Sequence, residues 1–141
     1  RYSFPTPFRL VWAGETVLRR LGLGFRAPYV ARATEAVVEG ALDLETLHLL
    51  PYAEAKERLM EVPGIGSKVA DCILVFSLDK LEAFPIDVWV RRALNEWYFD
   101  GKKIQDRALL AWAQDYFGEY AGYAQQYLFH GRRLQKTPSK S

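Results

Sequence analysis

The chain has 141 residues, 50% of them hydrophobic, which is enough for one compact core but short for two ordinary domains. Its formal net charge is only +2, so composition alone does not indicate a nucleic-acid-binding protein, and any anion site must come from local placement of charge. One cysteine and two histidines exclude an internal disulfide framework and leave too few ligands for an ordinary structural zinc site.

Hydrophobic residues recur with helical spacing along nearly the whole chain, and no segment shows the alternation typical of a strand. We predict helices at residues 8–21, 28–39, 44–49, 52–61, 67–78, 88–97, 105–117 and 120–134. Asp87 stands at the N-cap position of the helix at 88–97. No apolar run approaches the roughly 20 residues that a membrane span requires. The predicted fold is therefore an all-α helical array with short connections.

Residues 59–70 predict a helix, a tight turn and a second helix. Gly64 and Gly66 suit a turn whose backbone adopts conformations closed to other residues, or approaches a partner closely. The backbone N–H groups of these glycines and of the next helix, which begins at Ser67, then point outward as an anion site. For a bare pair of glycines, an ordinary helix corner without a ligand is the alternative.

The whole run, L-x-x-V-P-G-I-G-x-K-x-A, resembles the helix-hairpin-helix motif, which binds the DNA phosphate backbone without reading its sequence. The resemblance implies that Gly64, Gly66 and Ser67 contact phosphate. It also implies a structural Na⁺ or K⁺ ion held by turn carbonyls and bridging to a phosphate. The carbonyls at the matching positions are those of Met60, Val62 and Ile65. No other cofactor is expected.

Helix-hairpin-helix motifs also occur in non-catalytic modules, and Lys68 together with Asp87 separates an enzyme from such a module. Asp87 ends a loop with the sequence Phe-Pro-Ile-Asp. A hairpin followed by a Gly/Pro-rich loop ending in Asp resembles the helix-hairpin-helix DNA glycosylase superfamily. Within it, residues 21–27, 64–73, 85–88 and 120–125 are most similar to the 8-oxoguanine DNA glycosylases, and the resemblance covers residues 4–134.

The resemblance implies that Lys68 is the nucleophile and Asp87 the catalytic carboxylate. Attack on the sugar C1′ needs a neutral amine, whereas a free lysine has a pKa of about 10.4, so an apolar pocket or a nearby cation must favour the neutral form. A carboxylate near the sugar can stabilise positive charge at C1′ and move protons. Taken singly, a lysine at such a position is more often a solvated charge or a phosphate contact, and an aspartate is more often a helix cap; it is their joint occurrence at the family spacing that favours catalysis.

An enzyme acting on a base in duplex DNA must extrude it and hold it in a pocket. Gln125 and Phe129 share one face of the last predicted helix. By the resemblance, Phe129 stacks on the extruded purine and Gln125 bonds its Watson–Crick edge. Cys72 packs against the other side of the base, and Phe76 replaces a methionine that lines the family's pocket. Core packing is the alternative role for Phe129 and Cys72.

Three further residues are assigned to DNA contact by the resemblance. Phe25 is the wedge that inserts where a base leaves the stack. Arg26 offers donors to the cytosine left behind, with an ordinary exposed arginine as the alternative. Trp89 stands where vertebrate members carry a histidine.

The predicted function is excision of 8-oxoguanine by lysine attack on C1′, followed by imine formation and β-elimination at the abasic site. The expected partner is double-stranded DNA with an oxidised purine opposite cytosine. We expect a monomer, located with the DNA in a prokaryotic cytoplasm or a nucleus, and no membrane. Two alternatives stay open: a glycosylase for another damaged base on this scaffold, and a non-catalytic DNA-binding module. A single cysteine excludes the four-cysteine iron–sulfur loop of the endonuclease III-type relatives.

Residues 1–134 are expected to form one glycosylase domain, an excerpt from the C-terminal side of a longer enzyme. Residues 135–141 are expected to form a basic flexible tail. In the family, a sheet domain supplies the carbonyl that distinguishes 8-oxoguanine from guanine, and an upstream asparagine pairs with the orphan cytosine. Because this sequence contains neither, preference for the oxidised base rests on the resemblance.

Overall fold

The computed structural model describes residues 2–135, and over this range it contains helices and connecting segments but no strand. The all-α prediction is thus confirmed. No helix in this range is long and apolar enough to cross a membrane. The chain divides into two compact units, Arg1–Gly66 and Ser67–Ser141. Of the predicted tail, only Gln135 is described, as a turn residue, and positions 136–141 lie outside the described residues.

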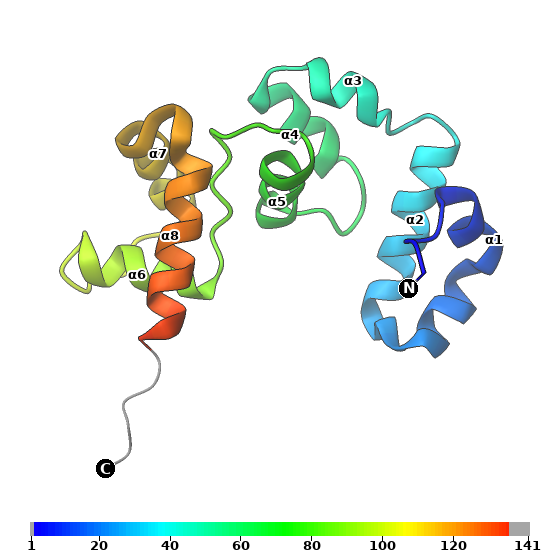
Figure 1. Cartoon of the computed structure of the whole chain (residues 1–141), viewed down its shortest axis with the longest axis horizontal. Coiled ribbons are helices and arrows are strands. Elements are labelled where there is room, and N and C mark those ends of the chain that lie inside the picture. Colours follow the sequence, from blue (N-terminus) through cyan, green and yellow to red (C-terminus); the bar gives the residue numbers. More distant parts are fainter. Residues whose placement is uncertain (1, 136–141) are drawn as a thin grey trace, which may run out of the picture. The chain divides into compact units, whose positions relative to one another are not determined.

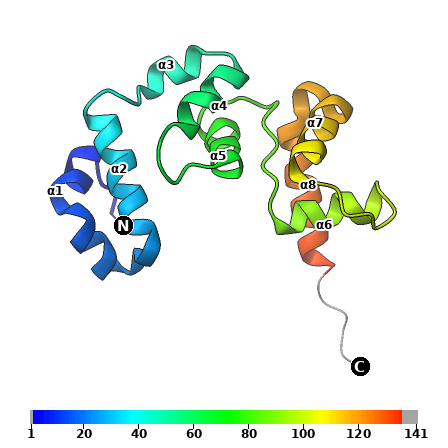
Figure 2. The same cartoon turned by 180° about the vertical axis from the view of Figure 1, so that it is seen from behind.

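The first unit contains four α-helices: α1 (Pro7–Leu18), α2 (Ala27–Val38), α3 (Leu44–Leu49) and α4 (Tyr52–Met60) (Figure 1). α1 ends earlier than predicted, because the chain passes into a π-helical segment, Arg19–Leu23, and then a 3-10 turn, Gly24–Arg26. Within this connection Gly22 has a φ of +90°, which a residue with a side chain rarely adopts. α1 and α2 pack side by side (Figure 2). Their contact buries Leu18, Ala27 and Ala31.

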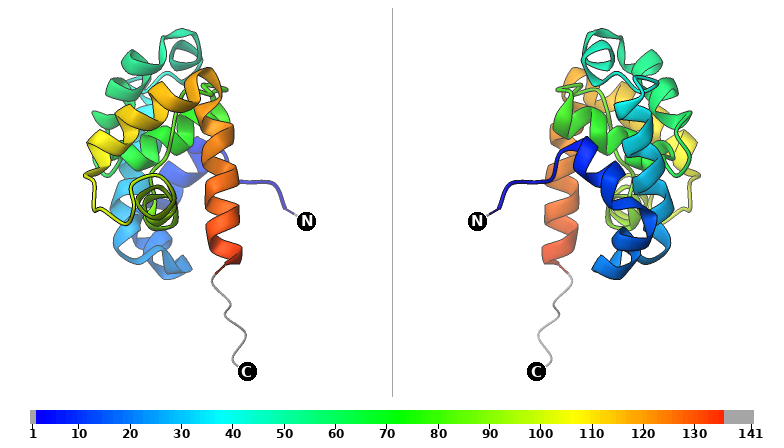
Figure 3. Two further views of the ribbon diagram at one scale, coloured as in Figure 1. Left: turned by 90° about the vertical axis from the view of Figure 1, so that its left-hand side faces the viewer. Right: turned by 90° about the vertical axis from the view of Figure 1, so that its right-hand side faces the viewer.

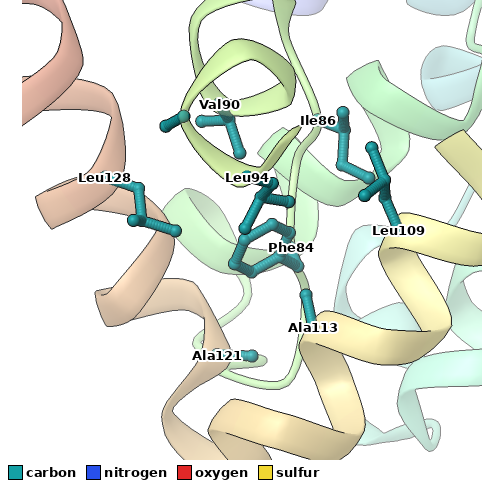
Figure 4. Close-up of a cluster of buried hydrophobic side chains, with 9 residues drawn as sticks. Phe84, Ile86, Val90, Leu94, Leu109, Ala113, Ala121 and Leu128 are labelled. Atoms are coloured by element: carbon teal, nitrogen blue, oxygen red, sulfur yellow. The ribbon is translucent and has the colours of Figure 1, made fainter. Parts of the chain in front are cut away.

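The second unit contains α5 (Ser67–Ser77), α6 (Val88–Trp97), α7 (Asp106–Phe117) and α8 (Ala121–Leu134). Its core combines the loop between α5 and α6 with α6, α7 and α8 (Figure 4). The labelled core side chains are Phe84, Ile86, Val90, Leu94, Leu109, Ala113, Ala121 and Leu128. The loop is itself buried over residues 83–86, so it forms part of the core.

α8 is the orange-to-red helix seen lengthwise in Figure 3. Its start lies very close to this loop at Gly122. The Gly122 N–H donates to the Leu81 carbonyl at 2.6 Å. A Cβ atom at Gly122 would lie 2.6 Å from a Val75 methyl and 3.0 Å from the Leu81 oxygen. Because real Cβ atoms do not tolerate such distances, only glycine allows α8 to pack this closely against the loop and α5.

Candidate active site

The second unit contains a pocket of about 240 Å³ that is open to solvent. It is lined by Lys68, Cys72, Phe76, Pro85, Asp87, Gln125, Gln126 and Phe129. Its volume lies just below the roughly 300–1,000 Å³ of sites for drug-sized ligands, which suits a ligand the size of one nucleobase. The pocket brings together both predicted catalytic residues and all four residues that the sequence assigns to the base pocket.

One row of side chains on α5 forms a wall of this pocket. Lys68, Cys72 and Phe76 follow one another at the four-residue spacing that places them on one helix face. The opposite face of α5 holds Ala70 and Leu74, both completely buried, which fixes the rotation of the helix. Lys68 is exposed, and no hydrogen bond or ion pair joins its side chain to another residue within 2–135. Its amine is therefore available at the pocket.

Asp87 contributes a carboxylate to the pocket while it caps α6. Its Oδ1 accepts the N–H groups of Trp89 at 2.9 Å and Val90 at 2.8 Å. Its Oδ2 accepts no hydrogen bond from the described part of the chain, so one carboxylate oxygen holds the helix and the other can meet a ligand. The pKa of Arg91 is raised, mainly by its hydrogen bonds to Asp106, and the charge of Asp87 adds to this effect.

The third wall comes from α8. Gln125 is only 4% exposed, and its Nε2 donates to the Pro85 carbonyl at 2.9 Å. Its Oε1 accepts from Nε2 of Gln126. Phe129 is half-buried and packs against the core, so it both lines the pocket and supports the core. Pro85 and Gln126 also line the pocket, although neither was predicted to be a site residue. Pro85 acts through its backbone carbonyl, and Gln126 carries no helical-period signal because it is exposed.

The predicted wedge residues lie on the 3-10 turn of the first unit. Phe25 is 70% exposed, and the guanidinium carbon of Arg26 lies 4.6 Å from the centre of its ring. An exposed aromatic ring of this kind is available to enter a base stack. In the second unit, the half-buried ring of Trp89 lies 5.3 Å from the guanidinium carbon of Arg92. Neither group lines the pocket.

The hairpin contains Gly64 and Gly66, which precede Ser67 at the start of α5. The structure requires glycine at these two positions to different degrees. Gly64 has a φ of +92°, and a Cβ there would lie 2.4 Å from ring atoms of Tyr29. Gly66 has no positive φ, and beyond its two chain neighbours no described residue has an atom within 4 Å of the place where its Cβ would stand. Conformation and packing therefore require glycine at position 64 but not at position 66.

The carbonyls assigned to a monovalent cation belong to the same turn. The Val62 carbonyl accepts the Ile65 N–H at 3.0 Å, which closes the turn. Met60 ends α4, where backbone carbonyls lack partners within the helix. Among residues 2–135, no group of three or more His, Cys, Asp or Glu side chains could hold a metal ion, so carbonyl oxygens are the ligands that the turn offers.

No family model matches the chain, but both known proteins and solved structures are similar to it. A probable N-glycosylase/DNA lyase of Methanothermobacter thermautotrophicus is 44% identical over 117 residues, which cover 82% of this chain and 37% of that protein. The N-glycosylase/DNA lyase OGG1 of Arabidopsis thaliana is 34% identical over 139 residues, covering 91% of this chain and 38% of that protein.

Among solved structures, the 8-oxoguanine glycosylase/lyase of Clostridium acetobutylicum matches with a TM-score of 0.92 and 34% identity, covering 96% of this chain and 47% of that one. That protein was crystallised with double-stranded DNA containing cytosine opposite 8-oxoguanine. The chain belongs to the helix-hairpin-helix superfamily of DNA glycosylases. It spans less than half the length of these superfamily members.

Proposed function

We propose that the protein is a bifunctional DNA glycosylase and abasic-site lyase that excises 8-oxoguanine from duplex DNA. The observation that carries the proposal is that Lys68, Asp87 and the predicted base-reading residues line one pocket. A binding module would have no need to gather an amine, a carboxylate, a thiol and an aromatic ring around one base-sized space. The names of the relatives support both activities and the choice of base.

Lys68 is the proposed nucleophile. Its Nζ attacks C1′ of the extruded nucleotide as the bond between C1′ and the base breaks, and the electron pair of that bond leaves with the base. The C1′–O4′ bond then breaks with its electron pair going to O4′, which opens the sugar ring and gives an imine between C1′ and Nζ. Loss of a C2′ proton then forms a C2′=C3′ double bond as the C3′–O bond breaks, and the 3′ phosphate leaves with that electron pair (β-elimination). Asp87 stabilises the positive charge that develops at C1′ through its unpartnered Oδ2 and accepts a proton from the lysine amine.

The remaining walls hold the base. Phe129 from α8 and Cys72 from α5 line the pocket together, and we propose that the base lies between them. Phe129 contributes stacking, which any base can use, whereas Gln125 contributes hydrogen bonds that depend on the base edge. Phe76 is 59% exposed and forms part of the pocket rim.

The hairpin is proposed to hold the DNA backbone. Gly66 leaves open space where a side chain would otherwise stand, and the backbone N–H groups from Gly64 to Ser67 suit a phosphate oxygen. The carbonyls of Met60, Val62 and Ile65 would hold a Na⁺ or K⁺ ion that supplies positive charge beside this phosphate. Phe25 and Arg26 are proposed to fill the gap that the extruded base leaves and to face the orphan cytosine.

The test is covalent trapping. The full-length protein is incubated with a duplex containing 8-oxoguanine opposite cytosine, borohydride is added, and the covalent protein–DNA species is quantified. We expect trapping by the wild type and none by Lys68→Gln. Lys103→Gln is the matched control, because Lys103 is exposed on the turn between α6 and α7, outside the pocket.

The outcomes distinguish the three functional hypotheses: an 8-oxoguanine glycosylase and lyase, a glycosylase for another damaged base, and a non-catalytic DNA-binding module. Trapping with an abasic duplex but not with 8-oxoguanine would keep the lyase and overturn the choice of base. Trapping with neither duplex, while DNA binding persists, would leave Lys68 without its assigned role and favour a binding module. Salt dependence of DNA affinity would not discriminate, because phosphate contacts release counterions in all three cases.

A further inference from the structure

The side-chain amide of Gln125 has its orientation set by the loop between α5 and α6. Its Nε2 lies 2.9 Å from the Pro85 carbonyl oxygen. Because a carbonyl oxygen can only accept a hydrogen bond, the amide nitrogen must face Pro85 and Oε1 must face the other way. Gln125 is 4% exposed, so both ends of this amide need partners other than bulk water.

Gln126 supplies the partner at the other end. Its Nε2 donates to Oε1 of Gln125, so the amides of two successive residues are joined. Gln126 is exposed and lines the pocket, so this hydrogen bond lies at the pocket wall. The bond uses one lone pair of the Gln125 oxygen and leaves the second for a ligand.

We propose that Gln126 is a positioning residue that holds the Gln125 amide in the plane needed to read the extruded base, an inference that rests on the function proposed above. The hydrogen bond to Pro85 determines that Nε2 faces the loop and Oε1 faces away from it. The last side-chain torsion of a glutamine, however, otherwise takes a broad range of angles. The second bond, from Gln126, restricts that torsion. A guanine-type base presents N–H donors on its Watson–Crick edge, and the oriented Oε1 accepts from such a donor.

The test uses variants that remove the donor without changing the size of the side chain. Gln126→Glu keeps the shape but has no N–H, and Gln126→Met is uncharged and has neither donor nor amide oxygen. Gln135→Glu is the matched control, because Gln135 is exposed just beyond α8 and lies outside the pocket. For each variant of the full-length protein, single-turnover excision of 8-oxoguanine is compared with cleavage of a preformed abasic site.

We expect the ratio of the excision rate to the abasic-site cleavage rate to fall roughly tenfold in both Gln126 variants, because the loss of one hydrogen bond changes a rate by about this factor. The ratio should stay at the wild-type value in Gln135→Glu. Abasic DNA carries no base for Gln125 to read, so a general loss of folding would lower both rates and leave the ratio unchanged. An unchanged ratio in both Gln126 variants would overturn the proposal.

A second measurement does not depend on activity. The two side-chain amide protons of Gln125 give NMR resonances whose shifts report the hydrogen bonds of that amide. We expect these resonances to move in Gln126→Glu and Gln126→Met and to stay in place in Gln135→Glu. Identical Gln125 resonances in all four proteins would overturn the positioning role. If the wild type processed neither duplex, the function proposed above would fail, and these spectra alone would decide whether Gln126 holds Gln125.

Discussion

Lys68 and Asp87 reach one pocket from separate segments, Lys68 from the first turn of α5 and Asp87 from the end of the loop that precedes α6. Phe84 is completely buried and Ile86 nearly so, which anchors that loop in the core just before Asp87. The carboxylate is therefore held by packing as well as by its two cap hydrogen bonds. Such fixed placement is what electrostatic stabilisation of a developing charge requires.

Asp87→Asn should distinguish the role of Asp87 as the N-cap of α6 from the role of its negative charge in the pocket. Asparagine caps helices about as well as aspartate, so we expect the free energy of unfolding to change by less than about 0.5 kcal/mol. Loss of the carboxylate should lower the single-turnover excision rate by about 10²-fold or more. Unfolding in urea and excision of 8-oxoguanine measure the two effects.

The matched control is Asp43→Asn, because Asp43 caps α3 through Glu45 and Thr46 and lies outside the active-site pocket. We expect this variant to excise at the wild-type rate. An Asp87→Asn protein that is as active as the wild type would reduce Asp87 to a helix cap.

Gly122→Ala should destabilise the protein and distort the pocket together. The added Cβ would meet Val75 at 2.6 Å and two backbone carbonyl oxygens of the loop at 3.0 and 3.1 Å, and backbone atoms cannot move aside cheaply. We expect a loss of about 1–3 kcal/mol in the free energy of unfolding, as for other overpacked sites. Urea denaturation measures this loss, and excision kinetics report the pocket.

Gly131→Ala in the same helix is the control. Its Cβ would lie 3.6 Å from the Trp97 ring, an ordinary contact, and alanine favours a helix over glycine by about 0.5–1 kcal/mol. We expect neutral or raised stability. Equal destabilisation by the two substitutions would show that close packing at Gly122 is not the cause.

Most helices of this protein could be predicted, because their boundaries depend on residues that are close together in the sequence. Asp87 caps α6 at the predicted residue, since N-capping depends on one side chain and the next three backbone groups. The grouping of Lys68, Cys72 and Phe76 also follows from helical spacing alone. Their meeting with Gln125 and Phe129 across the unit was predicted only through the family resemblance, because spacing along one helix says nothing about another helix.

The rest could not be predicted, because it depends on contacts distant in sequence. Nothing around Gly122 indicates that Leu81 and Val75 will lie against it, since a helical glycine has no local requirement of this kind. Gln126 has an exposed position and no partner visible in the sequence. The end of α1 was missed for a different, local reason: the π-helical segment Arg19–Leu23 follows Leu18 directly and still carries apolar residues, so the sequence pattern does not mark where the α-helix stops.

Asp106→Asn should remove a small, pH-dependent part of the stability. Hydrogen bonds from Arg91 lower the pKa of the Asp106 carboxyl below its ordinary value of 3.8. A carboxyl whose folded-state pKa is lowered contributes stability above the unfolded-state value and loses it as the pH falls through the folded-state value. Because about half of the Asp106 side chain is exposed, we expect at most about 1 kcal/mol.

The measurement is urea denaturation from pH 6 down to about pH 2.5 for the wild type, Asp106→Asn and Arg91→Gln. Both variants should be less stable than the wild type at pH 6, and the difference should shrink toward zero at the lowest pH. A difference that stays constant over this range would contradict the assignment to the ion pair.

The two hairpin glycines should have different roles: we expect Gly64→Ala to lower the stability of the protein and Gly66→Ala to lower its affinity for DNA. Alanine at position 64 would have to adopt a φ of +92° and would overlap the Tyr29 ring at 2.4 Å. The left-handed conformation alone costs about 1–2 kcal/mol, so we expect a clear loss of stability in urea denaturation. Alanine at position 66 meets no described residue within 4 Å beyond its chain neighbours and needs no positive φ, so stability should change by less than about 0.5 kcal/mol.

DNA affinity, measured by fluorescence anisotropy with an undamaged duplex, should show a different pattern. We expect Gly66→Ala to weaken binding severalfold while the protein stays as stable as the wild type, because its methyl group occupies the space proposed for a phosphate. Lys103→Gln, which removes one exposed charge at a residue that is not part of the hairpin sequence, gives the size of a purely electrostatic loss. Wild-type affinity in Gly66→Ala would contradict close approach of the DNA backbone at this turn.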